Sequence, residues 1–346
     1  MGALLSALTG DEEIAAYFSD AADVEAMLRF EAALAQSQAE CGIIPAAAAA
    51  AIGKAAQALR PDMSSLAQGT SRDGVVTPSL VDQLRAAVDE EHRGFVHYGA
   101  TSQDATDSSL VLRLKPVIAR LKEGLKRLIA VLEAIKKRDG EILLIAHTRM
   151  MEAIGFTAGD KIASWIRPLR RIEDALPAVS DRLLVLQLGG PVGTRETYGS
   201  KADALARDLS ARLGLANAES WHTARDNIAA FGSWLSLLTG TLGKIGNDAL
   251  LLNQNKIGAL RLPGGGSSAM AHKQNPVGAE VLVTLGRYNA GLAGLLHQAL
   301  IHENERSGAA WTLEWMVLPS MVISAASALG HANDLAAGVV FHPMKS

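Results

Sequence analysis

Apolar residues recur along this chain in alternating steps of three and four, the spacing that places side chains on one face of an α-helix. The first clear series is Leu114, Ile118, Leu121, Leu125, Leu128, Leu132 and Ile135. The second is Ile228, Phe231, Leu235, Leu238, Leu242, Ile245, Ala249 and Leu252. A narrow apolar stripe maintained over that length predicts a long helix that packs against near-parallel neighbours.

Two more helices are predicted from the same periodicity. One follows His147 and ends near residue 178, with a bend near Pro168, because a proline inside a helix removes a backbone hydrogen bond. The other spans about residues 277–301, where one apolar face is formed by Val281, Leu285, Tyr288, Leu292 and Leu295. Strand signals are weak throughout the chain. Helices of roughly 25–30 residues measure about 40 Å, which is long for a globular protein.

These elements predict an all-α fold in two parts. Residues 1–105 form a small helical region, interrupted by glycines and prolines, and residues 106–346 form a central bundle of long helices. We expect the functional residues in the loops between the long helices, because loops carry most binding and catalytic groups.

Composition and charge narrow the function classes. Of the 346 residues, 49% are hydrophobic and 20% are charged, which is the balance of a water-soluble globular protein. The formal net charge of −3 gives no reason to expect nucleic acid or an anionic membrane surface as a partner. The single cysteine, Cys41, excludes a disulfide within one chain and a cysteine-based zinc site.

Two segments of the chain bear on whether the protein is secreted or spans a membrane. The N-terminal segment lacks the basic residues that begin a signal peptide, so we expect a cytoplasmic protein. The most apolar stretch, residues 281–301, contains Arg287, Asn289 and His297. We therefore expect it to be a helix buried in protein, within the chain or between subunits, and not a membrane span.

The segment that most suggests chemistry is the Gly/Ser-rich stretch at residues 263–280, PGGGSSAMAHKQNPVGAE. Its three consecutive glycines allow backbone N–H groups to face an anion, and Lys273 adds a positive charge. Ser267 and Ser268 are candidate proton carriers. A nucleotide-binding P-loop is excluded because no GK[ST] closes the pattern. By composition alone, a flexible hinge explains the segment equally well.

Residues 266–276, GSSAMAHKQNP, resemble the GSSxMPxKxNP signature of the fumarase/aspartase superfamily, with Ala271 in place of its proline. Three other segments occur in the superfamily's order: HYGATSQD at residues 97–104, which resembles its first, carboxylate-binding signature, QLGGPVGT at 187–194, and ENERS at 303–307. The resemblance covers about residues 70–320. It implies a bundle in which the signatures of several subunits of a homotetramer meet at shared active sites.

Other segments indicate which branch of the superfamily the chain resembles. WHTARD at residues 221–226 and AAWTLEW at 309–315 are similar to the carboxymuconate cycloisomerase branch. The second signature, close to GRTHLQxA in relatives, reads AHTRMMEA at residues 146–153, so Arg149 occupies the place of the usual histidine. Cycloisomerases of this branch can lack that histidine. The chain also ends before many relatives do, so their small C-terminal domain is expected to be absent.

The resemblance implies a reaction on a small polycarboxylate. A carboxylate of 3-carboxy-cis,cis-muconate adds to the opposite unsaturated acid and closes 4-carboxymuconolactone, a step of protocatechuate degradation by the β-ketoadipate route, with no cofactor and no metal. The implied catalytic residues are Ser267, Lys273, His147 and His97. The implied substrate-binding residues are Thr101, Ser102, Arg149, Arg225, Ser268, Asn275 and Arg306. Glu280 is implied to orient a neighbouring group, for which Arg149 is one candidate.

Two other functions stay open. An amino-acid or purine-pathway lyase such as adenylosuccinate lyase usually carries a histidine in a TRHD-like segment, whereas residues 71–74 read SRDG here. A non-catalytic structural homologue, as among the crystallins, is disfavoured by the intact Ser267, Lys273 and Asn275. The pattern is also compatible with a substrate whose 3-substituent is another anion, such as sulfonate.

Overall fold

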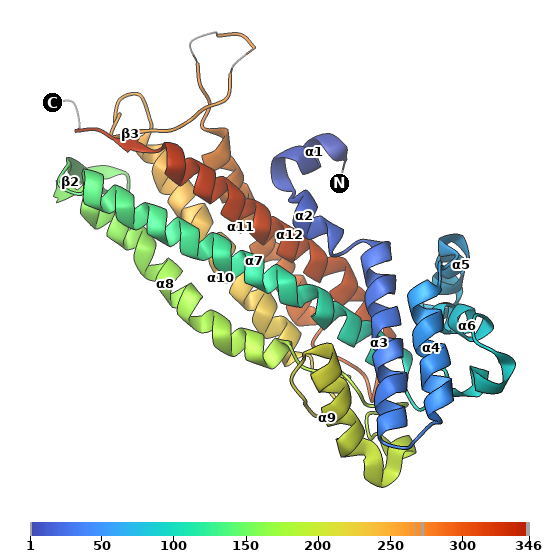
Figure 1. Ribbon diagram of the computed structural model, residues 1–346. Helices are drawn as coiled ribbons and strands as arrows, with labels where there is room; N and C mark the ends of the chain where they lie inside the picture. The colour runs from blue at the N-terminus through green and yellow to red at the C-terminus, as the bar shows by residue number, and fades with distance from the viewer. Residues whose placement is uncertain (1, 267, 271–272, 344–346) are drawn as a thin grey trace.

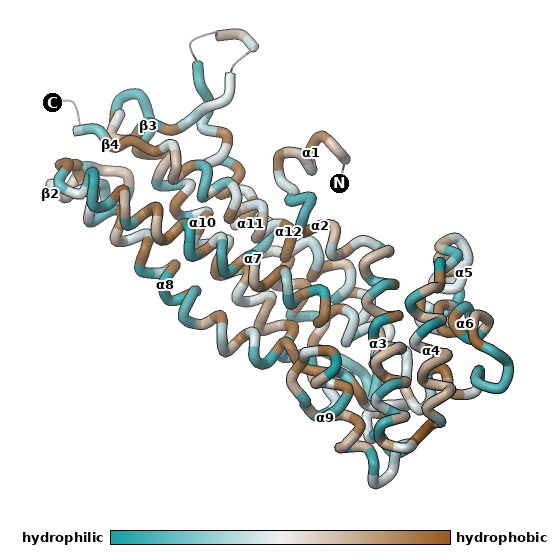
Figure 2. Tube along the Cα trace, viewed as in Figure 1, coloured by the Kyte–Doolittle hydropathy of each residue, from teal (hydrophilic) through white to brown (hydrophobic). Residues whose placement is uncertain are grey.

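The computed structural model describes residues 2–266, 268–270 and 273–343 and is predominantly helical with few strands, which confirms the predicted all-α class (Figure 1). The main body is a bundle of long helices: α7 (Ser102–Asp139), α8 (Ala158–Leu183), α10 (Asp226–Leu252), α11 (Val277–Gln298) and α12 (Gly308–Gly338). Helix α10 packs against α8, α11 and α12, and α7 packs against α8 and α12. Figure 2 shows hydrophobic and hydrophilic positions alternating along α7 and α8, as expected of helices that bury one side.

The two predicted apolar series lie within α7 and α10, and all of their residues are buried. Helix α7 begins before its series, at Ser102, where the Asp104 carboxylate accepts a hydrogen bond from the backbone N–H of Thr101. Helix α12 was not among the predicted helices. It is apolar on most sides, so it shows no amphipathic stripe, as expected of a helix surrounded by neighbours.

The helix predicted to follow His147 is present as α8, but a hairpin separates it from His147. The residues after His147 form an antiparallel hairpin of β1 (Leu143–Thr148) and β2 (Met151–Thr157), and α8 starts only at Ala158. The Thr157 hydroxyl accepts a hydrogen bond from the Asp160 N–H at the start of that helix. Strand β2 is exposed at its first five positions, so its sequence has none of the alternation that marks a half-buried strand.

The N-terminal region contains α1 (Ala3–Thr9), α2 (Glu12–Ala16), α3 (Asp20–Glu40), α4 (Ala46–Ala58), α5 (Met63–Asp73), α6 (Thr77–Ala86) and the 3-10 helix η1 (Glu90–Phe95). A hydrophobic cluster drawn from residues 24–96 is distinct from the cluster of the bundle. Helix α3 contributes to both clusters, since Phe30 packs in the bundle and Met27 in the other cluster. Residue 105, where the sequence suggested a division, lies in the first turn of α7.

The bundle has two ends that matter for the site. At one end, η2 (Glu196–Lys201) and α9 (Ala202–Leu213) lie beside α3, and we call this the α3 end. At the opposite end, β3 (Leu260–Arg261) pairs with β4 (Val340–Phe341) near the β1–β2 hairpin, and we call this the hairpin end (Figure 1). Helix α7 runs from one end to the other, and its 38 residues measure roughly 57 Å.

By length and composition alone, helices α10 and α12 are apolar enough to cross a membrane. Of their most apolar windows, 56% and 61% are buried against the rest of the protein, as expected of helices in a core.

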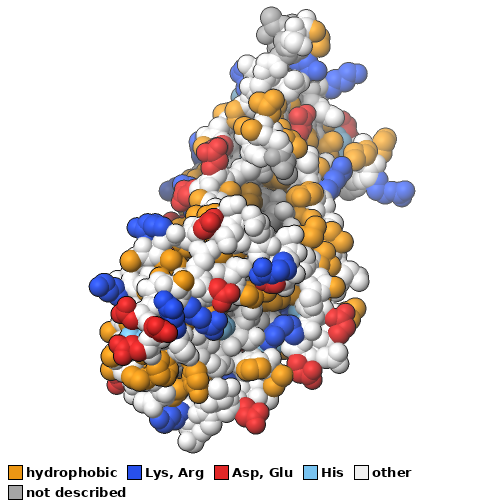
Figure 3. Space-filling view, turned by 90° about the vertical axis from the view of Figure 1, so that its right-hand side faces the viewer, with side chains coloured by type: hydrophobic (Ala, Val, Ile, Leu, Met, Phe, Trp, Pro, Cys, Tyr) orange, Lys and Arg blue, Asp and Glu red, His pale blue; other side chains and the backbone are white. Residues whose placement is uncertain are grey.

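On the face shown in Figure 3, basic and acidic side chains are interspersed.

Candidate active site

The residues predicted for the site lie at both ends of the bundle. Those at the α3 end are His97, Thr101, Ser102, Arg225 and Arg306. Those at the hairpin end are His147, Arg149, Ser268, Lys273, Asn275 and Glu280. Ser267 lies outside the described residues. Because α7 separates the two ends by roughly 57 Å, one chain does not bring the two groups together.

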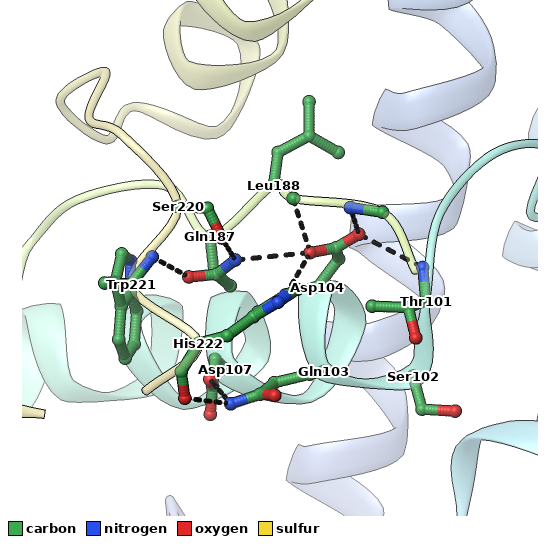
Figure 4. A network of polar contacts seen from close by, with 12 residues as sticks. Thr101, Ser102, Gln103, Asp104, Asp107, Gln187, Leu188, Ser220, Trp221 and His222 are labelled. Atoms are coloured by element: carbon green, nitrogen blue, oxygen red, sulfur yellow. Dashed lines mark hydrogen bonds and ion pairs between the residues drawn. The ribbon is translucent and has the colours of Figure 1, made fainter. Parts of the chain in front are cut away.

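At the α3 end, the buried carboxylate of Asp104 joins the first signature to the glycine turn at residues 187–194 (Figure 4). Asp104 accepts hydrogen bonds from the backbone N–H groups of Gly189 at 2.7 Å and Gly190 at 2.9 Å. It also accepts one from the N–H of Thr101 at 3.0 Å. Gly190 has a φ of +69°, a left-handed conformation that favours glycine. A single carboxylate therefore sets the geometry of two signature loops.

Two further side chains complete this network. Gln187 donates to Asp104 at 3.3 Å, and its carbonyl oxygen accepts from the Trp221 N–H at 2.8 Å. The Nε2 of His222 lies 3.0 Å from Asp104 Oδ1, and its Nδ1 is buried without a partner in the described ranges. The sequence by itself indicates no role for Asp104, Gln187 or His222. Their only signal was their place inside the matched segments, since the contacts of Gln187 and His222 with Asp104 span 83 and 118 residues.

The position of Arg225 argues against its predicted role in substrate binding. Its side chain is 1% exposed, and its guanidinium donates to Asp107 at 2.6 and 3.1 Å and to Glu314. Asp107 also accepts from Trp311 and Gln103. Burial raises the pKa of Glu314 despite the opposing charge of Arg225, as expected for two carboxylates sharing one cation. Within one chain, Arg225 is therefore a buried cation shared by two carboxylates, which argues against the substrate-binding role implied by the resemblance.

Ser102 and Arg306 line a surface cleft of about 740 Å³ at the α3 end, a volume that suits a small ligand. Arg306 is exposed and is steadied from one side, because its Nε donates to Gln103 at 3.1 Å and its Nη2 to the carbonyl of Pro191 at 3.0 Å. The cleft also contains Asp73, in the segment where a purine-pathway lyase would keep a histidine. A cation and a hydroxyl in one cleft can bind a carboxylate.

The residues at the hairpin end are more exposed. His147 lies on β1, where its Nδ1 is 3.1 Å from the carbonyl of Ile145. Arg149 stands in the exposed hairpin turn with a φ of +50°. Glu280 is exposed in the first turn of α11, and within the described part of the chain no ion pair joins it to Arg149. The pairing that we considered from the sequence is therefore not formed inside one chain.

The described polar residues named for the loop before α11 are exposed or half-buried. Asn275 is half-buried and exchanges two backbone hydrogen bonds with Gly265, at 2.8 and 2.7 Å, which close the neck of the loop. Lys273 and Ser268 are exposed beyond this neck. In the described ranges, no three His, Cys, Asp or Glu side chains are grouped so as to hold a metal ion.

Comparison with known proteins places the chain in a family. A family model described as lyase matches residues 10–288. The 3-carboxy-cis,cis-muconate cycloisomerase of Pseudomonas aeruginosa is 41% identical over 332 residues, covering 94% of this chain and 72% of that protein. The N-acetyl-S-(2-succino)cysteine lyase of Enterococcus italicus is 32% identical, covering 89% of this chain and 69% of that protein.

The fold agrees with these sequence relationships. The crystal structure of 3-carboxy-cis,cis-muconate lactonizing enzyme from Pseudomonas putida matches with a TM-score of 0.93 at 36% identity, covering 99% of this chain and 78% of that one. The chain therefore belongs to the lyase family and has the long-helix fold of the fumarase/aspartase superfamily.

Proposed function

We propose that this protein is a cytoplasmic cycloisomerase that converts 3-carboxy-cis,cis-muconate to 4-carboxymuconolactone without a cofactor. The observation that carries the proposal is the 41% identity, over nearly the whole chain, to a relative that bears this name. The cleft that holds Ser102 and Arg306 supports it, because a hydroxyl and a guanidinium suit a substrate that carries several carboxylates.

The proposed reaction needs only acid–base and electrostatic catalysis. One substrate carboxylate attacks the β-carbon of the opposite unsaturated acid, and the π-electron pair moves onto that acid to give a dianionic aci-carboxylate. The α-carbon then takes a proton, so the product is an isomer of the substrate. Lys273 and Asn275 stabilise the aci-carboxylate, and one such donor contributes about 3–4 kcal/mol. Ser267 delivers the proton.

The remaining predicted residues bind and orient the substrate in this proposal. Thr101, Ser102 and Arg306 hold one carboxylate at the α3 end. Arg149 holds another, because a guanidinium stays protonated and cannot shuttle protons but can clamp a carboxylate with two hydrogen bonds. His147 is left as a candidate proton donor, and Glu280 as the group that orients a residue of another subunit.

We infer that the working protein is a homotetramer in which each site draws on several chains. The separation of the two groups of site residues by roughly 57 Å supports this, since a small substrate cannot reach both in one chain. Large exposed apolar side chains on or beside α10, α11 and α12 also support it. They are Leu237, Tyr288, Leu295, Ile301 and Met316.

The first prediction is a direct test of activity. Purified protein should bleach the ultraviolet diene absorbance of 3-carboxy-cis,cis-muconate, and EDTA should leave the rate unchanged, because no step uses a metal. A parallel assay with the 3-sulfonate analogue tests the identity of the anion. If the diene absorbance persists while adenylosuccinate is cleaved, the protein is a purine-pathway lyase instead.

The second prediction concerns shared sites. Arg306→Ala and Lys273→Ala should each be inactive alone, and co-assembly after mixing should restore about one quarter of the activity, because half of the chains carry each intact segment. Lys273→Ala mixed with Asn275→Ala is the matched control and should restore nothing, since both changes lie in one loop of one chain. A fully active monomer by light scattering would contradict the shared-site arrangement.

A further inference from the structure

The first signature is held in place by α3, a helix that no sequence motif connects to it. Glu31 and Gln38 are seven residues apart, so they lie on the same face of α3, and their exposed fractions are 2% and 0%. Glu31 Oε1 lies 2.6 Å from Nδ1 of His97, and Gln38 Nε2 donates to the carbonyl of Tyr98 at 2.6 Å. Two buried polar side chains therefore fix two consecutive residues of the loop.

His97 adopts a conformation that needs such support. Its φ is +60°, in the left-handed region that is uncommon for residues other than glycine, although Asn, Asp and His occupy it more often than most. A backbone conformation of this kind persists only where surrounding contacts over-determine it, and such residues gather at functional sites. Within the described part of the chain, His97 makes one side-chain hydrogen bond, to Glu31, and its Nε2 makes none.

The charges around His97 favour its protonated form. The charged groups that act on it are Glu31 from α3, which contacts it, and Asp104 from α7 and Arg85 from α6. Burial by itself lowers the pKa of His97, but the charge and hydrogen bond of Glu31, with the charge of Asp104, outweigh burial and raise the pKa above 6.5. The other oxygen of Glu31 is buried and has no hydrogen-bond partner in the described ranges, so His97 is the partner on which this carboxylate depends.

We propose that Glu31 is a positioning residue of the active site, which holds His97 as a fixed cation whose free Nε2–H binds a carboxylate of the substrate. This rests on the proposed function for the identity of the substrate. It also revises the expected role of His97. A histidine kept protonated by a buried carboxylate is a weak base, so it serves for anion recognition and not for proton transfer.

Folding stability and substrate binding should both depend on pH, because the pKa of His97 is raised in the folded protein. Because the pKa of His97 is raised on folding, the ion pair stabilises the folded protein fully below the unfolded value of about 6.5. That contribution is lost as the pH rises through the pKa of the folded state. Substrate binding should weaken over the same range, because neutral His97 no longer neutralises a substrate charge.

The test compares the full-length protein with Glu31→Gln, which keeps the shape of the side chain but removes its charge. The imidazole resonances of ¹³C-labelled histidine are followed against pH, and the His97 signal is identified by its loss in His97→Gln. We expect His97 to titrate above pH 6.5 in the parent protein and at lower pH in Glu31→Gln. At a pH where only the variant has lost its His97 proton, KM for 3-carboxymuconate should rise about tenfold or more while kcat changes little.

Two further variants separate positioning from general destabilisation. Glu40→Gln removes a carboxylate from an exposed position of the same helix and should change neither the titration nor KM. Glu31→Asp keeps the charge and should retain much of the raised titration and of the affinity. If Asp is as damaging as Gln at every pH, Glu31 is only structural.

The outcomes distinguish this proposal from the proposed function. Titration of His97 at or below pH 6.5 in the parent protein overturns it, and that measurement stands even if Glu31→Gln does not fold. A titration that is unchanged by Glu31→Gln overturns it too. If the titration shifts as expected but 3-carboxymuconate is not a substrate, the ion pair stands and the assigned reaction fails.

Discussion

Replacing Arg225 with methionine is expected to destabilise the fold by about 3–5 kcal/mol, out of a total of about 5–15 kcal/mol for a typical domain. Methionine fills the volume but leaves the carboxylates of Asp107 and Glu314, which are 0% and 1% exposed, without their shared cation. An uncompensated charge in an apolar environment costs far more than the lost hydrogen bonds themselves. The thermal midpoint should fall by roughly 5–15 °C, as measured by calorimetry.

Two comparisons show whether buried charge is the cause. Arg207→Met, at an exposed position of α9, should leave the midpoint nearly unchanged. Adding Asp107→Asn and Glu314→Gln to Arg225→Met should recover much of the loss, because the orphaned charges are then removed as well. If Arg225→Met instead keeps its stability and raises KM, the expected substrate-binding role returns and the structural one is wrong.

Replacing Ser267 with alanine is expected to lower kcat about 10²-fold or more, with KM, fold and assembly preserved. The reason is chemical: in the proposed reaction the α-carbon needs a proton from a positioned donor, and alanine removes the hydroxyl that carries it. Turnover is measured by the diene absorbance, and assembly by light scattering.

The neighbouring serine is the matched control for this change. Ser268 is exposed on the same loop, and Ser268→Ala should reduce turnover much less than Ser267→Ala. The reverse result, a damaging Ser268→Ala and a mild Ser267→Ala, would reassign the proton donor. Equal and small effects would point to His147 as the donor.

Several parts of the fold follow from the sequence because they depend on local periodicity. The apolar stripes of α7 and α10 lie where their spacing predicted, since burying one face of a long helix requires that spacing. Helix α12 and the β1–β2 hairpin did not follow from it. The helix is apolar on most sides and the hairpin is largely exposed. Neither therefore shows the alternation of apolar and polar residues that predicts a half-buried element.

The sequence also predicts which loops contain the candidate site residues, because each loop signature is a short continuous segment that can be identified without knowing the fold. Only the tertiary structure decided what each side chain touches. Arg225 meets Asp107 across 118 residues, and His97 meets Glu31 across 66. Whether an arginine binds substrate or sits in a buried ion pair depends on such distant partners, because burial and charge are properties of the folded environment and not of the residue itself.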